Sequence, residues 1–419
     1  MTTTTARPAR RPNRLWLLGP ALVAGVAYLD PGNVASNMTA GAQYGYLLVW
    51  VVLAGNVMAW LIQYLSAKLG VVTGQSLPEL LGARLRSPWA RRGYWLQAEL
   101  VAMATDVAEI IGGAVALNLL FGVPLLLGGI ITGAVSMALL LLQSRRGPRP
   151  FEFVIVGLMV IITVGFIAGL FVAPPDPAAI VGGIVPRFEG TGSVLLAASI
   201  LGATIMPHAI YAHSALSRDR FGSADAGTEA ARTETSRIRS LLTMTRWDVS
   251  IAMIVAGTVN LGILLLAAAN LAGVAGTDSL EGAHAALAVG LGPVVATLFA
   301  VGLLASGLAS TSVGAYAGAE IMHGLLRVRI PMLVRRLVTL IPALVILGLT
   351  IDPTVALVLS QVVLSFGIPF ALIPLVALTA QRRTLGIWTN HVWTTIAGVV
   401  SSVLLIALNG ALLWLVLTA

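Results

Sequence analysis

The sequence contains no cysteine, which excludes disulfides, thiolate metal ligands and a cysteine nucleophile. The thioethers of its 11 methionines are the only sulfur it offers to a ligand. Charged residues are scarce as well, at 10% of the 419 residues, against about a quarter in ordinary soluble domains. A single water-soluble core is therefore excluded, because too little of the surface could be polar.

Apolar residues make up 58% of the chain and give a mean hydropathy of +0.93. They recur in blocks of about 20 residues, the length that crosses a bilayer as a helix. The first block lacks a small-residue cleavage site, so we expect it to be retained. The sequence predicts an all-α membrane protein with eleven transmembrane helices, at about residues 15–40, 46–69, 94–121, 123–143, 151–173, 192–217, 248–271, 292–326, 331–350, 354–380 and 390–417.

The basic residues that give the net charge of +8 lie in short loops between apolar blocks, where they indicate orientation and not nucleic-acid binding. They cluster before the first block and after every second block, and only Arg187 falls on the opposite side. Basic loops stay in the cytoplasm. We therefore expect a multi-pass membrane protein with a cytoplasmic N-terminus, beginning with a tail at 1–14, and an extracellular C-terminus.

Two predicted helices carry helix-breaking residues near mid-membrane. The first contains Asp30-Pro31-Gly32-Asn33, and the sixth contains Met206-Pro207-His208. Proline removes a hydrogen-bond donor and glycine loosens the backbone, so helices 1 and 6 should unwind at mid-membrane and free carbonyl oxygens. A proline kink whose Asp30 pairs with a basic residue is the alternative, but no Lys or Arg lies at that depth in any predicted span.

Breaks at matching positions in the first and sixth spans, which run in opposite directions, are typical of inverted repeats in transporters. We expect a first repeat of five helices at 15–173 and a second at 192–380. The second contains a cytoplasmic loop at 218–247, and an added helix follows at 390–417.

The two breaks together offer a cation site. Asp30 supplies a carboxylate, Asn33 an amide oxygen, Ala27 and Ala203 freed carbonyls, and Met206 a thioether. Mixed oxygen and sulfur ligands favour transition metals over Mg²⁺ and Ca²⁺, which prefer oxygen alone. Mn²⁺ and Fe²⁺ fit best, and softer ions such as Cd²⁺ should compete.

These motifs resemble the NRAMP family of proton-coupled divalent metal transporters, above all the bacterial manganese importers of actinobacterial type. The resemblance covers essentially the whole chain and includes DPGN in the first span, MPH in the sixth and WLQAELVAMATDVAEIIGGA in the third. It implies a LeuT-like fold, the same metal ligands and a place in the bacterial plasma membrane. Three positions depart from the family pattern, namely Ala209 and Gly367, where an amide is usual, and Glu320, where Gln is common; they put contacts near the pathway in doubt.

The third span places Glu99, Asp106 and Glu109 within about 80° of one helical face, which must line protein or water. Arg335 and Arg336 open the ninth span and could pair with these acids, as the resemblance also implies. We expect a proton on Asp30 to pass by way of Asp106 and Glu109 when metal binds. A purely structural ion-pair network remains the alternative.

His208 lies beside the second break and is the candidate pH modulator, since histidine titrates near neutrality. A packing histidine is nearly as good an interpretation. His213 is expected to line the inner vestibule.

The sequence thus predicts a secondary active transporter, a metal ion and proton symporter that works by alternating access. It is not expected to be an enzyme, to carry a cofactor or to need a protein partner; its partners are the two ions and the bilayer. A sodium-coupled solute symporter, an intramembrane enzyme and a passive channel are the rivals. Asp30 would repel a substrate carboxylate, and no HExxH or GxSxG motif supports an enzyme.

Overall fold

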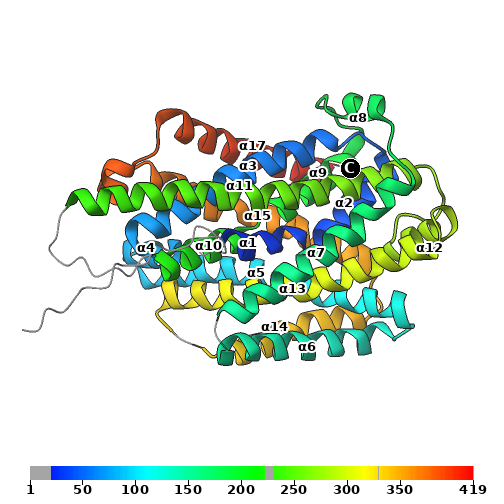
Figure 1. Ribbon diagram of the computed structural model, residues 1–419, viewed down its shortest axis with the longest axis horizontal. Helices are drawn as coiled ribbons and strands as arrows, with labels where there is room; N and C mark the ends of the chain where they lie inside the picture. Colours follow the sequence, from blue (N-terminus) through cyan, green and yellow to red (C-terminus); the bar gives the residue numbers. More distant parts are fainter. Residues whose placement is uncertain (1–19, 147, 222–230, 329, 419) are drawn as a thin grey trace, which may run out of the picture.

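The computed structural model describes residues 20–146, 148–221, 231–328 and 330–418. All regular structure in these ranges is helical. The predicted tail at 1–14 lies outside the described residues. The longer helices run along the long axis of the molecule, and the short helices α4 and α8 lie at opposite ends of it (Figure 1).

The α-helices are α1 Pro20–Val26, α2 Pro31–Tyr44, α3 Val49–Thr73, α4 Leu77–Arg84, α5 Pro88–Phe121, α6 Leu125–Arg146, α7 Pro148–Val172, α8 Pro177–Gly183, α9 Gly190–Thr204, α10 Pro207–Phe221, α11 Ala231–Asn270, α12 Leu280–Gly290, α13 Pro293–Leu326, α14 Met332–Gly348, α15 Pro353–Thr379, α16 Arg382–Leu385 and α17 Val392–Thr418, and the 3-10 helices are η2 Ala27–Leu29 and η3 Gly386–Trp388.

Eight helical stretches of the described chain are long and apolar enough to cross a membrane. The sequence predicts eleven, and the three that fall short have clear reasons. The first predicted span is divided into α1, η2 and α2, the stretch of α6 whose side chains are described, Leu125–Leu141, is short, and α14 has 17 residues. The all-helical fold with several apolar helices agrees with the prediction. The predicted number of eleven spans stays a prediction.

The segment 218–247 differs from the expected loop. Helix α10 continues to Phe221, and α11 is already helical from Ala231, while residues 222–230 lie outside the described ranges. Polarity suggested a loop, but Ala, Arg, Glu and Leu are good helix formers, so a polar segment rich in them extends a helix beyond the apolar block.

Helices α1 and α2 lie inside the bundle (Figure 1). Helix α1 packs against α11, α10, α7 and α13, and α2 packs against α11, α9, α15 and α5. The segment between α1 and α2 is therefore enclosed by helices from both halves of the chain. A polar group there meets protein and not lipid.

Candidate metal site

The first helix is interrupted at Asp30. After α1, the chain forms one 3-10 turn, η2, and Asp30 is extended, with φ −72° and ψ 163°. Pro31 then starts α2, where its fixed φ suits the first helical position and its missing N–H costs nothing. The Asp30 carboxylate caps α2, because its Oδ1 accepts a hydrogen bond of 2.7 Å from the Asn33 amide. The local sequence thus directs a carboxylate toward the positive end of a helix.

The second interruption lies between α9 and α10. Helix α9 ends at Thr204, Ile205 leaves helical geometry with φ −113° and ψ 64°, and α10 begins at Pro207. Met206 sits in the gap and is fully buried. Its thioether is therefore held in the protein interior at the break and does not face lipid.

One side chain joins the two interruptions. The Asn33 Nδ2 group donates to Asp30 Oδ1 at 3.0 Å and to the carbonyl oxygen of Ala203 at 2.9 Å. The Ser36 and Ser199 hydroxyls, 2.6 Å apart, continue this contact between α2 and α9. Carboxylate, amide and carbonyl, three groups that the sequence analysis assigns to one site, are therefore direct neighbours. Ala27 and Met206 are buried on the same two interrupted segments.

Sequence analysis missed one residue of this cluster, Gln361 on α15. Its Nε2 donates to Asp30 Oδ2 at 3.3 Å, and it packs so tightly on Gly32 that a Cβ there would come within 1.8 Å of Nε2. Two amide oxygens of the cluster, Asn33 Oδ1 and Gln361 Oε1, are buried without a hydrogen-bond partner. A lone glutamine within the apolar span 354–380 is the signal that could have identified it, since polar residues in a span are costly and usually functional.

The cluster is rich in acceptors and poor in positive charge. Asp30 is fully buried, and within the ranges described no Lys, Arg or His forms an ion pair with it. The same residues contain no group of three or more His, Asp or Glu side chains able to hold a metal. A cation at this place would therefore depend on a mixed set of carboxylate, amide, carbonyl and thioether ligands.

The acids of the third predicted span meet both arginines of the ninth. Arg335 Nη2 lies 2.9 Å from Glu99 Oε1, and Arg336 Nη1 contacts Asp106 and lies 3.2 Å from Glu109 Oε2. These contacts connect α5 with α14. The expected pairing is present, and its role in moving protons stays a prediction.

This network approaches the first break through Gly112 of α5. A Cβ on Gly112 would lie 2.1 Å from the Pro31 Cβ, a distance that no side chain tolerates. Glycine is therefore required for α5 to pack directly against the start of α2.

Neither predicted histidine has a described hydrogen bond to Asp30. His208 Nδ1 lies 3.1 Å from the Thr105 hydroxyl of α5. His213 Nδ1 lies 2.6 Å from Gln63 Oε1, and Gln63 in turn donates to the hydroxyl of Tyr28 in η2. His208 thus faces the helix with the acids, whereas His213 connects through Gln63 to the first break.

The structure shows what surrounds the three residues that depart from the family pattern. Ala209 is fully buried. A Cβ on Gly367 would lie 2.5 Å from Val101 Cγ2, so a larger side chain would need α5 to shift. Glu320 has a partner, since its Oε2 lies 3.1 Å from Arg218 Nη1.

Proteins of similar sequence are named divalent metal cation transporters. The chain is 60% identical over 403 residues to a divalent metal cation transporter, MntH, of Mycobacterium tuberculosis, covering 96% of this chain and 92% of that protein. It is 46% identical to MntH of Deinococcus radiodurans over 98% of this chain and 92% of the relative.

Solved structures with a similar fold are also transporters. A mutant form of the manganese transporter of Eremococcus coleocola superposes with a TM-score of 0.84 at 32% identity, covering 97% of this chain and 88% of that one. The transporter MHP1, at 16% identity and a TM-score of 0.58, shares the LeuT-like fold alone. Residues 21–415 match the family described as natural resistance-associated macrophage protein-like, which confirms the resemblance seen in the motifs: this chain belongs to the Nramp family.

Proposed function

We propose that this chain imports divalent transition metal ions, chiefly Mn²⁺ and also Fe²⁺ and softer ions such as Cd²⁺, together with protons. The observation that carries the proposal is the buried Asp30 carboxylate at a helix interruption, bridged by Asn33 to the Ala203 carbonyl of the second interruption. The relatives support it, since they are named divalent metal cation transporters and one solved homologue is a manganese transporter. Their names also favour a transporter over an enzyme.

In this proposal, Asp30, Asn33, Met206 and the carbonyls of Ala27 and Ala203 bind the metal. The Asn33 amide lies between two of these acceptors, and turning it by 180° would present its oxygen to a cation in their midst. Gln361 could supply a further oxygen from α15. A dehydrated cation would repay the cost of burying the carboxylate, which has no positive partner in the ranges described.

Met206 would set selectivity. A thioether contributes to binding of Mn²⁺, Fe²⁺ and still softer ions, but little to binding of Mg²⁺ or Ca²⁺. Because Met206 is buried at the break itself, removing its sulfur changes the ligand chemistry without removing a charge.

Proton movement would use Asp30 and the network of α5 and α14. A metal ion displaces the proton from Asp30, and Asp106 and Glu109 receive it within reach of Arg336. Glu99 with Arg335 continues the route along α5 toward the cytoplasm, while His208 and His213 tune it from α10.

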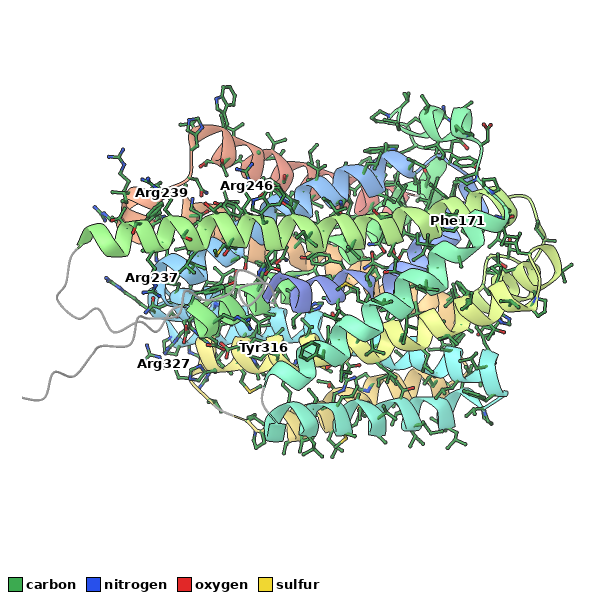
Figure 2. The ribbon with its side chains drawn as sticks, viewed as in Figure 1. Phe171, Arg237, Arg239, Arg246, Tyr316 and Arg327 are labelled. Carbon is green, nitrogen blue, oxygen red and sulfur yellow. The ribbon has the colours of Figure 1, made fainter. Side chains whose placement is uncertain are left out.

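The architecture that fits this function has eleven spans, with repeats at 15–173 and 192–380 and an added helix at 390–417. Alternating access would come from movement of one repeat against the other around the interrupted helices. The N-terminus would be cytoplasmic and the C-terminus extracellular. Figure 2 supports this orientation, since Arg237, Arg239 and Arg327 lie together at the end of the molecule where α11 begins and α13 ends.

The test is uptake of Mn²⁺ into proteoliposomes at several external pH values. Asp30→Asn should abolish uptake, since it removes the charge at nearly constant shape. Met206→Ala should keep Mn²⁺ uptake but allow inhibition by excess Mg²⁺ or Ca²⁺, and Met159→Ala, a buried methionine of α7, should behave as wild type. Equal inhibition of wild type and the Met206 variant by Mg²⁺, or full uptake by the Asp30 variant, would contradict the proposal.

A further inference from the structure

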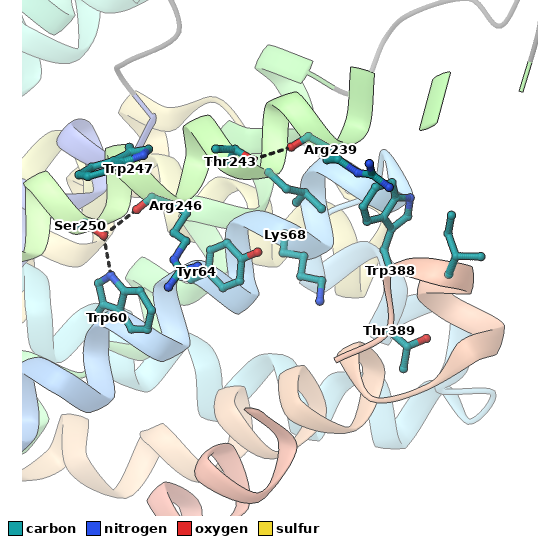
Figure 3. Close-up of a pocket in the computed structure, with 12 residues that line it drawn as sticks. Trp60, Tyr64, Lys68, Arg239, Thr243, Arg246, Trp247, Ser250, Trp388 and Thr389 are labelled. Carbon is teal, nitrogen blue, oxygen red and sulfur yellow. Dashed lines mark hydrogen bonds between the residues drawn. The ribbon is translucent and has the colours of Figure 1, made fainter. Parts of the chain in front are cut away.

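A cavity of about 570 Å³ lies apart from the candidate metal site, between α3, α11 and the chain around η3 (Figure 3). Helix α3 contributes Trp60, Tyr64 and Lys68 to its wall, α11 contributes Arg239 and Arg246, and η3 contributes Trp388. The transport proposal above uses none of these side chains. Their combination of cationic and aromatic groups calls for a separate explanation.

The wall of the cavity carries positive charges that no acidic side chain of the lining balances. Lys68, Arg239 and Arg246 line it, and no carboxylate does. Lys68 is only 7% exposed, and its Nζ donates to the neutral Asn390 Oδ1 at 2.9 Å. In the described part of the chain none of the three cations has an ion pair, and the Arg246 guanidinium lies 5.8 Å from the centre of the Trp60 ring. Three unneutralised cations around one cavity favour an anionic ligand.

The lining residues separate charge from aromatic surface along the helices. Trp60, Tyr64 and Lys68 follow one another at intervals of four on α3, so they share one face. Lys68 and Arg239 lie toward the ends of α3 and α11 that we assign to the cytoplasm, and Trp60 lies about 12 Å deeper along α3. Two cations thus lie near the membrane surface, with the Trp60 indole and the Arg246 guanidinium below them, an order that suits a lipid headgroup above its glycerol and acyl chains.

The mouth of the cavity opens toward the surroundings of the protein. Trp247 and Ile387 line it and are 67% and 79% exposed, as expected for side chains that face lipid at the membrane interface. Thr243 and Ser250 also line the cavity, but their hydroxyls donate to the backbone carbonyls of Arg239 and Arg246, so the polar contacts to a ligand fall to the cations (Figure 3). A ligand that is anionic at one end and apolar at the other would satisfy both parts of the wall.

We propose that this cavity binds the phosphate of an anionic phospholipid of the cytoplasmic leaflet. A zwitterionic headgroup fits less well, because its own cation would face three positive side chains. Bound there, the lipid phosphate would join α3 to α11 and to the segment that precedes α17, and so stabilise the contact between them. Free inorganic phosphate shares the anionic chemistry but would leave the aromatic and apolar wall unused.

The test is binding of phosphatidylglycerol to the purified full chain in detergent, measured by native mass spectrometry. Phosphatidylcholine with the same acyl chains and inorganic phosphate are the comparison ligands. Wild type should bind phosphatidylglycerol at least tenfold more tightly than phosphatidylcholine, and inorganic phosphate should not compete at equal concentration. Arg239→Gln combined with Arg246→Gln should lose this preference. Both side chains are exposed, so the fold should persist.

The matched control is Arg86→Gln combined with Arg91→Gln, which makes the same change in net charge at the N-terminal end of α5. It should keep the tenfold preference. A second readout is the thermal unfolding midpoint, which phosphatidylglycerol should raise for wild type and the control but not for the cavity variant. The proposal is overturned if both double variants lose the preference equally, if wild type shows none, or if inorganic phosphate displaces the lipid.

Discussion

Gly112 is the residue at which the acid-bearing helix α5 touches the first interruption. Because a Cβ there would overlap Pro31, Gly112→Ala should push α2 away from α5 and distort the Asp30 cluster. Overpacking of this kind typically costs about 1 to 3 kcal/mol. We expect Mn²⁺ uptake to fall at least tenfold in proteoliposomes.

The control for this change is Gly157→Ala on α7, where an added Cβ meets no atom within 4 Å. It should leave uptake unchanged. Normal uptake by the Gly112 variant would show that the contact between α5 and α2 does not position the site.

Arg336 is fully buried, and its single positive charge is shared by two buried carboxylates, those of Asp106 and Glu109. Arg336→Met should leave two buried carboxylates without a cation, a loss of about 3 to 5 kcal/mol for a broken buried pair. The thermal unfolding midpoint in detergent should therefore fall clearly. Adding Asp106→Asn should recover part of the loss, because one of the two charges is then gone.

The exposed Arg187 lies apart from this network, so Arg187→Met is the matched control and should unfold as wild type does. If Arg336→Met with Asp106→Asn is no more stable than Arg336→Met alone, the arginine stabilises α14 through packing and not through its charge.

At the scale of elements, Arg218 of α10 ties α4 to α13 at one end of the bundle. Its Nη1 lies 2.9 Å from Glu79 of α4 and 3.1 Å from Glu320 of α13. Burial raises the pKa of Glu79, but the hydrogen bond from the Ser76 amide and the contact with Arg218 outweigh it, so this pKa lies below its usual 4.5. Only the ionised form holds the tie.

A carboxylate whose pKa is lowered by folding stabilises the protein above the usual pKa and loses that contribution as the pH falls through the lowered value. Glu79→Gln should therefore lower the unfolding midpoint at pH 7, and the difference from wild type should vanish as the pH falls below 4.5. Glu189→Gln, which changes an exposed carboxylate before α9, should show no such convergence. A difference that is constant with pH would mean that Glu79 acts as a neutral helix cap.

The sequence predicts a structural feature well when neighbouring residues determine it, and poorly when tertiary packing does. The breaks at Asp30-Pro31 and Met206-Pro207 have a largely local cause, because proline removes a helical hydrogen bond, and the structure interrupts both helices there. Proline alone does not decide the outcome, since Pro342 lies inside α14 and Pro369 and Pro374 lie inside α15. The start of α11 at Ala231 was misjudged because polarity indicates exposure and not conformation. Gln361 was missed because only tertiary packing brings α15 onto Gly32.

At the scale of the whole molecule, the absence of cysteine makes the predicted orientation easy to test with single introduced thiols. Ala90 and Ala178 are both exposed, on α5 and α8 respectively. Ala90 is flanked by Arg84, Arg86 and Arg91, whereas α8 carries no basic residue. Because basic segments stay in the cytoplasm, the two alanines should face opposite sides.

A membrane-impermeant maleimide should therefore label Ala178→Cys in intact cells, and Ala90→Cys only after the membrane is permeabilised. Both variants must label after permeabilisation, which controls for buried thiols, and both should still take up Mn²⁺. The reverse pattern would place the basic loops outside and exchange the roles of the two ends. The proton route would then run outward along α5, and the cavity of Lys68 and Arg239 would face the outer leaflet.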